Sequence, residues 1–508
     1  MVRIGELLQA ITVKESMNHR DLEITGVSYH SQKVSQGDLF VCVKGYKTDG
    51  HKYLSQAISK GAAAAVVEDY QESMSIPQYI VGNSRQALAQ LGAAFYRSPS
   101  EKMKMIGITA TNGKTTTSYM TNAILENHGF RTGLIGTVSI KNDDSYIPSE
   151  LTTPESLDLQ NYLAQMADND VSHVSMEVSS IAMDMYRVET VDYDIVMLNN
   201  VSREHLADHG SFENYFAAKS KLIRNAREGS FAVLNLDCPY SSSLIGETMA
   251  TPVTYGVKSD HGHLTCRNLD LSTGRAKFTV EIVKPFYAEG REYEPCQFDM
   301  ELAVPGLHSV YNSMAAITAG LLSGVSISTI QETLRTFGGV ERRFEMIYDK
   351  DVKVLDDHFA NAGNINVTLE TLKYMDFNNL HLIYAIRGAR GIEVNRENAE
   401  TIAEWATKLG VDEITATSSV SHVTEKDKVQ EEEVEIFQQV MEDAGITVHL
   451  YDELPEAITH ALASIESEDL VLLGGCQGMD HGAEIALHQL NQREAGKVEL
   501  RQTIFSTE

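Results

Sequence analysis

A Gly-Lys-Thr unit at 113–115 lies within the stretch G-I-T-A-T-N-G-K-T-T-T that begins at Gly107. The apolar run 103–108 predicts a buried strand and residues 118–127 predict the body of a helix, so the unit falls where a strand turns into a helix. There the backbone N–H groups attract phosphate, the lysine supplies a charge and the threonine hydroxyl can reach Mg²⁺. We therefore predict a phosphate-binding loop, although Ile108 stands where its first glycine is usual.

Further polar segments follow short apolar runs and can lie beside Lys114 at the carboxyl edge of a parallel sheet. Glu177 ends the strand-like run 171–176 and could hold Mg²⁺, and His205 follows the strand-like run 195–199 and could hold a second ion. The segments are Leu151–Glu155, Ser175–Ser180, Ser202–Gly210 and Tyr215–Lys219.

Composition limits the class of protein. A chain of 508 residues suggests about three domains, and 43% hydrophobic with 22% charged residues is typical of a globular protein. The formal charge of −29 argues against nucleic acid or an anionic membrane as partner. No apolar run reaches the roughly 20 residues that span a bilayer, and the N-terminus does not look like a signal peptide. We expect a cytoplasmic monomer that acts on small molecules, with its five scattered cysteines reduced.

The order of predicted strands and helices favours an α/β protein of three domains. Residues 1–98 form a first α/β unit, residues 99–336 alternate strand and helix as in a doubly wound sheet, and residues 337–508 repeat that alternation. Short alternating segments at 251–305 predict an antiparallel β insertion. The acidic run 430–435 is expected to be a solvated helix face rather than a metal site.

Taken together, these motifs resemble the Mur ligase family, the ATP-dependent amino-acid ligases of peptidoglycan synthesis, and most of all its branch that adds the third residue of the peptide. The resemblance covers nearly the whole chain. It includes the phosphate loop, the Thr-Thr-Pro at 152–154, the Met-Glu-Val-Ser-Ser at 176–180, and the segments at 308–316 and 343–345. It implies a central ATPase-like sheet, an N-terminal domain similar to a uridine-nucleotide-binding domain, and a Rossmann-like C-terminal domain.

The resemblance also implies a mechanism in which ATP phosphorylates a carboxylate of a UDP-N-acetylmuramoyl peptide. An amine then attacks the acyl phosphate, which demands charge neutralisation and alignment more than a protein nucleophile. The implied catalytic residues are Lys114, Glu177, His205 and Lys219, with Lys219 carbamylated. Two Mg²⁺ ions would be held by Thr115, Glu177, His205 and Lys219. The implied ATP-binding residues are Gly107, Thr109, Thr111, Asn112, Gly113, Lys114, Thr115, Thr116, His308, Asn312, Arg343 and Asp356.

Substrate residues follow from the same comparison, with departures from the family pattern. The implied donor-binding residues are Ser31, Thr152, Thr153, Ser179 and Arg187, although the usual Asp-Ser-Arg reads His-Ser-Gln at 30–32. In the C-terminal domain the Asp-Asn-Pro-Arg signature is replaced near 418–422, and Gly-Lys-Gly-His-Glu becomes Gly-Cys-Gln-Gly-Met-Asp at 475–480. We expect the acceptor to contact Arg387, Arg390, Ser419, His422 or Asp480.

The replaced Asp-Asn-Pro-Arg signature includes an arginine, and its loss predicts a different acceptor. A site that pairs opposite charges discriminates strongly between acceptors. Diaminopimelate is therefore expected to be a poor acceptor, while lysine, another amino acid or a specialised amine remain open. Two alternatives stand beside a muramoyl-peptide ligase. One is a related ligase that joins other acids and amines, and the other is a phosphate-loop ATPase with a binding or regulatory role.

Overall fold

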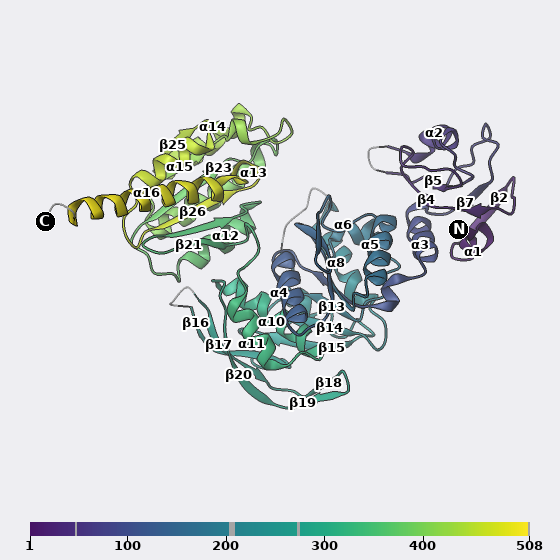
Figure 1. The fold of residues 1–508 in the computed structure, drawn as a ribbon, viewed down its shortest axis with the longest axis horizontal. Helices are drawn as coiled ribbons and strands as arrows, with labels where there is room; N and C mark the ends of the chain where they lie inside the picture. Colours follow the sequence, from purple (N-terminus) through teal and green to yellow (C-terminus); the bar gives the residue numbers. More distant parts are fainter. Residues whose placement is uncertain (46–47, 203–208, 272–274, 506–508) are drawn as a thin grey trace. The chain divides into compact units, whose positions relative to one another are not determined.

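A computed structural model of the chain describes residues 1–45, 48–202, 209–271 and 275–505 (Figure 1). The chain forms two compact units. The first comprises Met1–Cys266, Glu281–Gln297 and Asn312–Thr333, and the second comprises Arg267–Val280, Phe298–Tyr311 and Leu334–Glu508. The α/β class is confirmed, whereas the division at 98 and 336 stays a prediction.

The N-terminal part of the first unit contains a five-stranded sheet of order β2-β7-β6-β5-β4. Strands β4 to β7 are parallel and β2 is antiparallel to β7, so only the edge strand departs from the α/β pattern. The strands are β2 (Val13–Met17), β4 (Val27–Ser28), β5 (Leu39–Val41), β6 (Ala64–Val67) and β7 (Gln78–Val81), beside the short pair β1 (Val2–Arg3) and β3 (Glu23–Ile24). The helices are α1 (Ile4–Leu8), α2 (Leu54–Ser59) and α3 (Ser84–Tyr96).

The phosphate loop follows β8, which lies inside a larger sheet of order β11-β10-β9-β12-β8-β13-β14-β15-β16. Strand β8 pairs in parallel with β12 on one side and with β13 on the other. The strand order therefore reverses direction at β8. Ligands of open α/β sheets bind at such a switch point. The strands are β8 (Lys104–Thr109), β9 (Thr132–Ile135), β10 (Ser139–Asn142), β11 (Ser145–Pro148), β12 (His173–Glu177), β13 (Ile195–Leu198), β14 (Phe231–Asn235), β15 (Thr251–Gly256) and β16 (Leu264–Asp270).

Helices pack against this sheet and hold its strands in position. Helix α4 packs on β9 and β12, while α5 and α8 contribute apolar side chains to the core cluster that contains Val174 and Leu198. The helices are α4 (Lys114–Asn127), α5 (Ser156–Asp168), α6 (Ser180–Asp184), α8 (Phe212–Arg224), α9 (Pro239–Ser242), α10 (Leu307–Leu322) and α11 (Ile327–Thr336).

The expectation of an antiparallel insertion at 251–305 is wrong at its first two strands. Strand β15 pairs in parallel with β14 from Phe231↔Thr251 onward, and β16 pairs in parallel with β15, so both continue the parallel sheet. Alternating apolar residues predict a strand but not the direction of its neighbour. The later strands of this stretch are β17 (Lys277–Ile282), β18 (Phe286–Ala288), β19 (Arg291–Tyr293) and β20 (Cys296–Glu301), of which β18 and β19 form an antiparallel hairpin.

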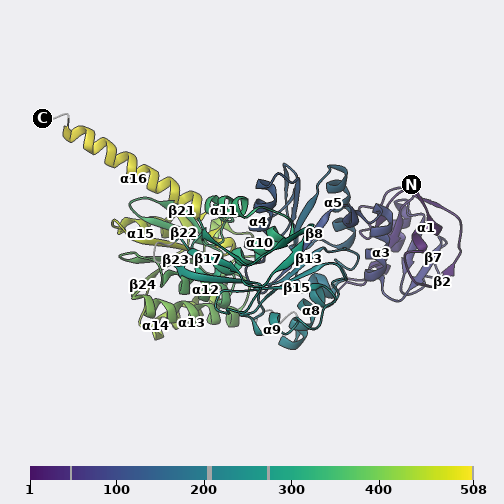
Figure 2. The same cartoon turned by 90° about the horizontal axis from the view of Figure 1, so that it is seen from below.

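The second unit is built on a six-stranded sheet of order β21-β22-β26-β23-β24-β25. It is parallel except for β21. Helices cover both of its faces, as in a doubly wound fold (Figure 2), and an apolar cluster lies on each face. The strands are β21 (Glu345–Asp349), β22 (Lys353–Asp357), β23 (Leu380–Ala385), β24 (Glu413–Thr417), β25 (Thr447–Tyr451) and β26 (Leu470–Gly475). The helices are α12 (Ala362–Leu372), α13 (Ile392–Leu409) and α14 (Glu431–Asp443) on one face, and α15 (Leu454–Ala463) and α16 (Gly482–Phe505) on the other.

Within the described residues, no helix is both long and apolar enough to cross a membrane. No disulfide bond joins any of the five cysteines, all of which lie in the described part of the chain.

Candidate active site

Gly113 shapes the loop between β8 and α4. It caps α4 with φ 86°, a left-handed conformation that favours glycine. A Cβ atom at this position would lie 2.3 Å from Oδ1 of Asn312, so a side chain is excluded by contact as well as by conformation. The loop therefore places the first N–H groups of a 14-residue helix at the carboxyl end of β8, which suits a phosphate.

Two lysines converge on one carbonyl group of this loop. Lys114 Nζ donates to the carbonyl oxygens of Ala110 and Thr111 over 2.9 and 3.1 Å, and Lys219 Nζ donates to Ala110 over 2.7 Å. Lys219 lies on α8, is only 2% exposed, and its ammonium lies 4.8 Å from the ring centroid of Tyr215. The structure thus brings the predicted Lys114 and Lys219 together.

Glu177 ends β12 and is fully buried beside the first turn of α4. One carboxylate oxygen accepts hydrogen bonds of 3.0 Å from the hydroxyls of Thr115 and Thr137, and the other accepts 2.8 Å from the backbone N–H of Thr137. A hydroxyl and a carboxylate in contact form the oxygen set that Mg²⁺ prefers. Thr115 and Glu177 therefore fit a magnesium ion, and Thr137 holds the carboxylate in place.

The middle of the loop is held by Asn200, which the sequence did not single out, and by Tyr215 and Ser202, which lie in predicted segments. Asn112 donates its N–H to the side chain of Asn200 over 3.0 Å and accepts 2.9 Å from it, while the Thr111 hydroxyl lies 3.1 Å from Tyr215 Oη. The backbone N–H of Ser202 also donates to the Thr111 hydroxyl. Asn200 is the second residue after β13, so its place near a strand end was a signal that could have found it.

The other predicted ATP residues of the first unit lie around this loop. Thr109 ends β8, and its buried hydroxyl has no hydrogen-bond partner among the described residues. Thr116 is partly buried on α4. Gly107 lies within β8, where a Cβ atom would come 2.7 Å from the ring of Tyr193, so packing alone already requires a glycine there. Its assignment to ATP stays a prediction.

A chain of contacts links the predicted donor residues to Glu177. The Thr153 hydroxyl donates to the Glu177 carbonyl over 2.8 Å and accepts 3.1 Å from Ser179 N–H. Arg187 donates to the Thr153 carbonyl over 3.0 Å and pairs with Glu155 over 2.7 Å. The structure therefore groups Thr153, Ser179 and Arg187 at the end of β12.

Two donor residues lie in other settings. Thr152 lies with its hydroxyl 3.2 Å from that of Thr137, next to the Glu177 group. Ser31 is buried in the N-terminal part, and its hydroxyl donates to Gln56 over 2.7 Å. The predicted metal ligand His205 lies outside the described residues.

The remaining ATP candidates belong to the second unit. His308 lies 3.1 Å from the Thr371 hydroxyl, and burial lowers its pKa to about 4, so the ring is neutral near pH 7. Arg343 donates to the carbonyl of Arg342. Burial raises the pKa of Asp356 to about 7, although the neighbouring Arg342 guanidinium acts in the opposite direction.

The predicted acceptor residues follow three strands of one sheet, and we refer to the segments 386–391, 418–422 and 475–481 as the acceptor loops. Ser419 donates to the Gly478 carbonyl over 2.6 Å, and the rings of His422 and His481 lie 5.7 Å apart. Arg387 donates to the carbonyl of Ala360, which follows β22. These contacts join Ser419 and His422 to the loop that carries Asp480.

Glu433 corrects the expectation that the acidic run 430–435 is a solvated helix face. It is 2% exposed, and its carboxylate accepts 2.7–3.0 Å bonds from the backbone N–H groups of Ala389, Arg390, Gly391 and Gln430. Burial raises the pKa of this carboxyl, but the N–H groups outweigh burial and hold the pKa below its usual value. The N-terminus of α13 is thus occupied by a carboxylate of the chain itself, and Arg390 pairs with Asp427 nearby.

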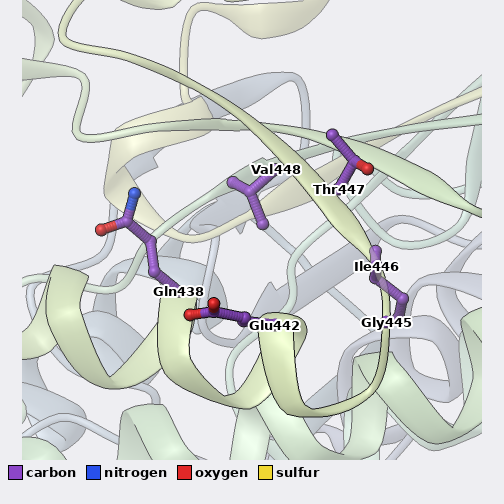
Figure 3. Close-up of a pocket in the computed structure, with 6 residues that line it drawn as sticks. All are labelled: Gln438, Glu442, Gly445, Ile446, Thr447 and Val448. Carbon is purple, nitrogen blue, oxygen red and sulfur yellow. The ribbon is translucent and has the colours of Figure 1, made fainter.

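A pocket of about 360 Å³ lies away from the acceptor loops (Figure 3). It is lined by Gln438, Glu442, Gly445, Ile446, Thr447 and Val448. Because Thr447 begins β25, this pocket lies at the amino end of a parallel strand, opposite the edge where α/β sheets bind ligands. None of the predicted site residues lines it.

Comparison with known proteins places these features in a family. Three family models match, described as Mur ligase family, catalytic domain (residues 23–96), Mur ligase middle domain (108–320) and Mur ligase, glutamate ligase domain (342–477). Relatives named UDP-N-acetylmuramoyl-L-alanyl-D-glutamate--2,6-diaminopimelate ligase include one from Caldanaerobacter subterraneus subsp. tengcongensis, 33% identical with 93% of this chain and 94% of the relative covered. Another, from Bacillus cereus, is 33% identical with 94% of each covered.

Solved structures show the same fold at lower identity. A structure of UDP-N-acetylmuramoyl-L-alanyl-D-glutamate--2,6-diaminopimelate ligase has a TM-score of 0.67 and 20% identity, covering 96% of this chain and 99% of that chain. MurF ligase from Thermotoga maritima in complex with ADP has a TM-score of 0.63 and 19% identity, covering 92% and 98%.

These comparisons overturn the expectation that diaminopimelate is a poor acceptor, because the relatives are named for diaminopimelate ligation. The expectation rested on one lost arginine in the segment 418–422. The structure shows why this was weak evidence: guanidinium groups of Arg342, Arg387 and Arg390 all lie at or beside the acceptor loops. A missing motif residue therefore does not mean a missing charge.

The predicted phosphate loop with its glycine cap, the Thr115–Glu177 contact beside it and the similarity along nearly the whole chain agree with one another. The chain belongs to the Mur ligase family, the ATP-dependent ligases that join an acid to an amino acid.

Proposed function

We propose that this chain joins 2,6-diaminopimelate to UDP-N-acetylmuramoyl-L-alanyl-D-glutamate. An amide bond forms between a donor carboxylate and an acceptor amine, while ATP is split to ADP and phosphate. The observation that carries the proposal is the contact between Thr115 and Glu177 at the predicted phosphate loop, in a chain whose similarity to the diaminopimelate ligases covers 93–94% of its length.

The residues present fit ATP and Mg²⁺. The helix N-terminus at Gly113 suits the phosphates, and the Thr115 hydroxyl with the Glu177 carboxylate would hold a first Mg²⁺. We propose that Lys219 is carbamylated and, with His205, holds a second ion. Carbamylation needs a sheltered amine and yields an anion, and Lys219 is 98% buried at this place. When bound, the nucleotide and its metal supply the phosphoryl group that activates the carboxylate and neutralise its charge.

The chain's own residues then orient the reactants. Lys114 places a positive charge at the start of α4, and the side chains of Asn200 and Tyr215 fix the loop through hydrogen bonds to Asn112 and Thr111. Such preorganised groups lower a barrier without rearranging during the reaction. We propose the donor to be held by Ser31, Thr152, Thr153, Ser179 and Arg187, and the acceptor by Arg387, Arg390, Ser419, His422 and Asp480.

A coupled assay of ADP release tests this function. The dipeptide nucleotide is combined with ATP, Mg²⁺ and a panel of amino acids that includes 2,6-diaminopimelate and lysine, and the product is identified by mass. Efficient formation of the diaminopimelate tripeptide is expected. ADP release that never depends on the dipeptide nucleotide would overturn the donor assignment, and turnover with lysine alone would overturn the acceptor assignment.

Lys114→Ala separates the ATP site from the rest of the assignment. Ligation should fall roughly 10²- to 10³-fold, because one preorganised charge at the phosphates is lost. Lys408→Ala, which removes an exposed lysine paired with Glu404, is the matched control and should turn over normally. A Lys114→Ala enzyme as fast as the control would contradict the phosphate-loop assignment.

A further inference from the structure

Arg342 adopts a backbone conformation that arginine rarely takes. Its φ is 56°, in the left-handed region, and the residue is only 8% exposed. Left-handed residues other than glycine cost free energy and are retained where the surrounding structure or the function requires them. Long charged side chains are also seldom buried without partners. The left-handed backbone and the burial of Arg342 are both unfavourable, so this residue requires contacts that stabilise it.

The guanidinium of Arg342 supplies these contacts, because it joins two strand ends. Its Nε lies 3.4 Å from the Asp356 carboxylate at the end of β22. Its other nitrogens donate to the carbonyl oxygens of Gly475 and Cys476, the latter over 3.0 Å, and to the Asp480 carboxylate. A planar guanidinium with several donors suits such a junction better than a lysine does.

Asp480 is the solvent-exposed partner of Arg342. Its side chain remains about half exposed (51%), while that of Asp356 is fully buried. The turn that carries Asp480 is also held by the Ser419 hydroxyl, which donates to Gly478 over 2.6 Å. The Asp480 carboxylate is held by Arg342 on one side and exposed to solvent on the other. It can therefore bind a cation without a change in its own conformation.

We propose that Arg342 is a positioning residue for the acceptor: it holds Asp480 so that its carboxylate binds an ammonium group of the incoming amino acid. This inference rests on the proposed function and deepens it. Arg342 contacts one carboxylate oxygen of Asp480, and about half of this side chain stays exposed, so the remaining oxygen lone pairs favour a cationic donor such as an ammonium group. An acceptor with a second amino group, such as a diamino acid, meets this requirement.

Steady-state kinetics of Arg342→Asn and Arg342→Lys test the role. Asparagine tolerates the left-handed backbone, so this variant removes the guanidinium with little new strain. We expect the KM for diaminopimelate to rise at least about tenfold, which corresponds to about 1.4 kcal/mol, with a smaller effect on the KM for ATP, whose candidate residue Asp356 also contacts Arg342. Arg342→Lys keeps the positive charge but lacks the planar guanidinium donors, so it should retain more affinity for the acceptor than Arg342→Asn does.

Arg97→Gly is the matched control. Arg97 is also a left-handed arginine, with φ 61° at the end of α3, far along the chain from the acceptor loops. Neither KM should change in this variant. Asp480→Asn should reproduce the effect of Arg342→Asn, and the double variant should add little to either single one, because both changes remove the same interaction.

The pH profile distinguishes positioning from a structural role. Burial raises the pKa of Asp480, while Arg342 and His481 lower it and Asp427 raises it further. Without Arg342 the pKa of this carboxyl should rise, so the acid-side increase of the acceptor KM should move to higher pH. Parallel increases of the KM for ATP and for the acceptor, or an unshifted profile, would overturn the proposal. A wild-type enzyme without ligase activity would instead contradict the proposed function.

Discussion

Lys114 and Lys219 donate hydrogen bonds to the same carbonyl oxygen, that of Ala110, over 2.9 and 2.7 Å. One lysine lies at the start of α4 and the other on α8, so two ammonium groups from separate helices share one acceptor. Like charges held this close oppose each other. Conversion of one amine to an anion would replace this repulsion with attraction, both to the other lysine and to a divalent cation.

The first prediction therefore concerns Lys219. Lys219→Ala should be nearly inactive, and short-chain carboxylates such as formate or acetate should restore part of the activity by supplying the missing anion. The wild-type enzyme should lose activity in bicarbonate-free buffer and regain it with bicarbonate. Full activity of Lys219→Ala without added anions would rule out a carbamylated lysine at this position.

The second prediction uses a pair of glycines. Gly113→Ala places a methyl group in a left-handed position against Asn312, whereas Gly129→Ala has the same conformational cost, with φ 99°, but open space around its Cβ. Gly129→Ala should lower stability by about 1 kcal/mol. Gly113→Ala should lose more and should also raise the KM for ATP. Urea midpoints and ATP kinetics check this, and equal effects of the two changes would show that the Asn312 contact is unimportant.

Glu433 provides the third prediction. Glu433→Ala leaves four backbone N–H groups without their carboxylate, and each buried unpaired donor costs about 1–3 kcal/mol. The thermal midpoint should fall strongly and the acceptor KM should rise. Glu431→Ala, an exposed glutamate in the same first turn of α14, is the control and should be nearly neutral. A Glu433→Ala protein as stable as this control would contradict the assigned contacts.

The fourth prediction concerns pH. Burial holds the pKa of His308 at about 4, below the value of about 6.5 expected in the unfolded chain. The unfolded state then binds the proton more tightly, so this histidine contributes stability above pH 6.5 that is lost as the pH falls from about 6.5 towards 4. His308→Gln should flatten this part of the stability curve. The exposed His261→Gln is the control, and identical slopes in both variants would contradict the burial of His308.

The sequence predicted the parts of the site that local pattern controls. The strand, Gly-Lys-Thr and helix pattern predicts the position of Thr115, and the acidic residue at a strand end predicts that of Glu177. Because the carboxyl ends of parallel strands meet at one edge of the sheet, these two residues are expected to be close, and they are in contact. The strand-like run 195–199 matches β13 (Ile195–Leu198) to within one residue. Such signals need only neighbours in the chain.

Contacts between distant segments could not be predicted in this way. Glu433 reads as one of several acidic residues on a helix surface, and only the packing of α13 against α14 shows that it is buried. Arg342 carries no sign of its left-handed backbone in its residue type. The acceptor was misjudged for the same reason, because charge lost from one loop can be supplied by a residue from another.

The fixed phosphate loop has a consequence for the kinetics of nucleotide binding. The N–H groups of Thr111 and Asn112 already donate to Asn200, so these amides should exchange slowly with deuterium before any nucleotide is present. A loop that is ordered in advance does not have to fold around its ligand. Association should then follow simple diffusion-controlled, single-exponential kinetics at this loop, without a slow step that becomes independent of ATP concentration.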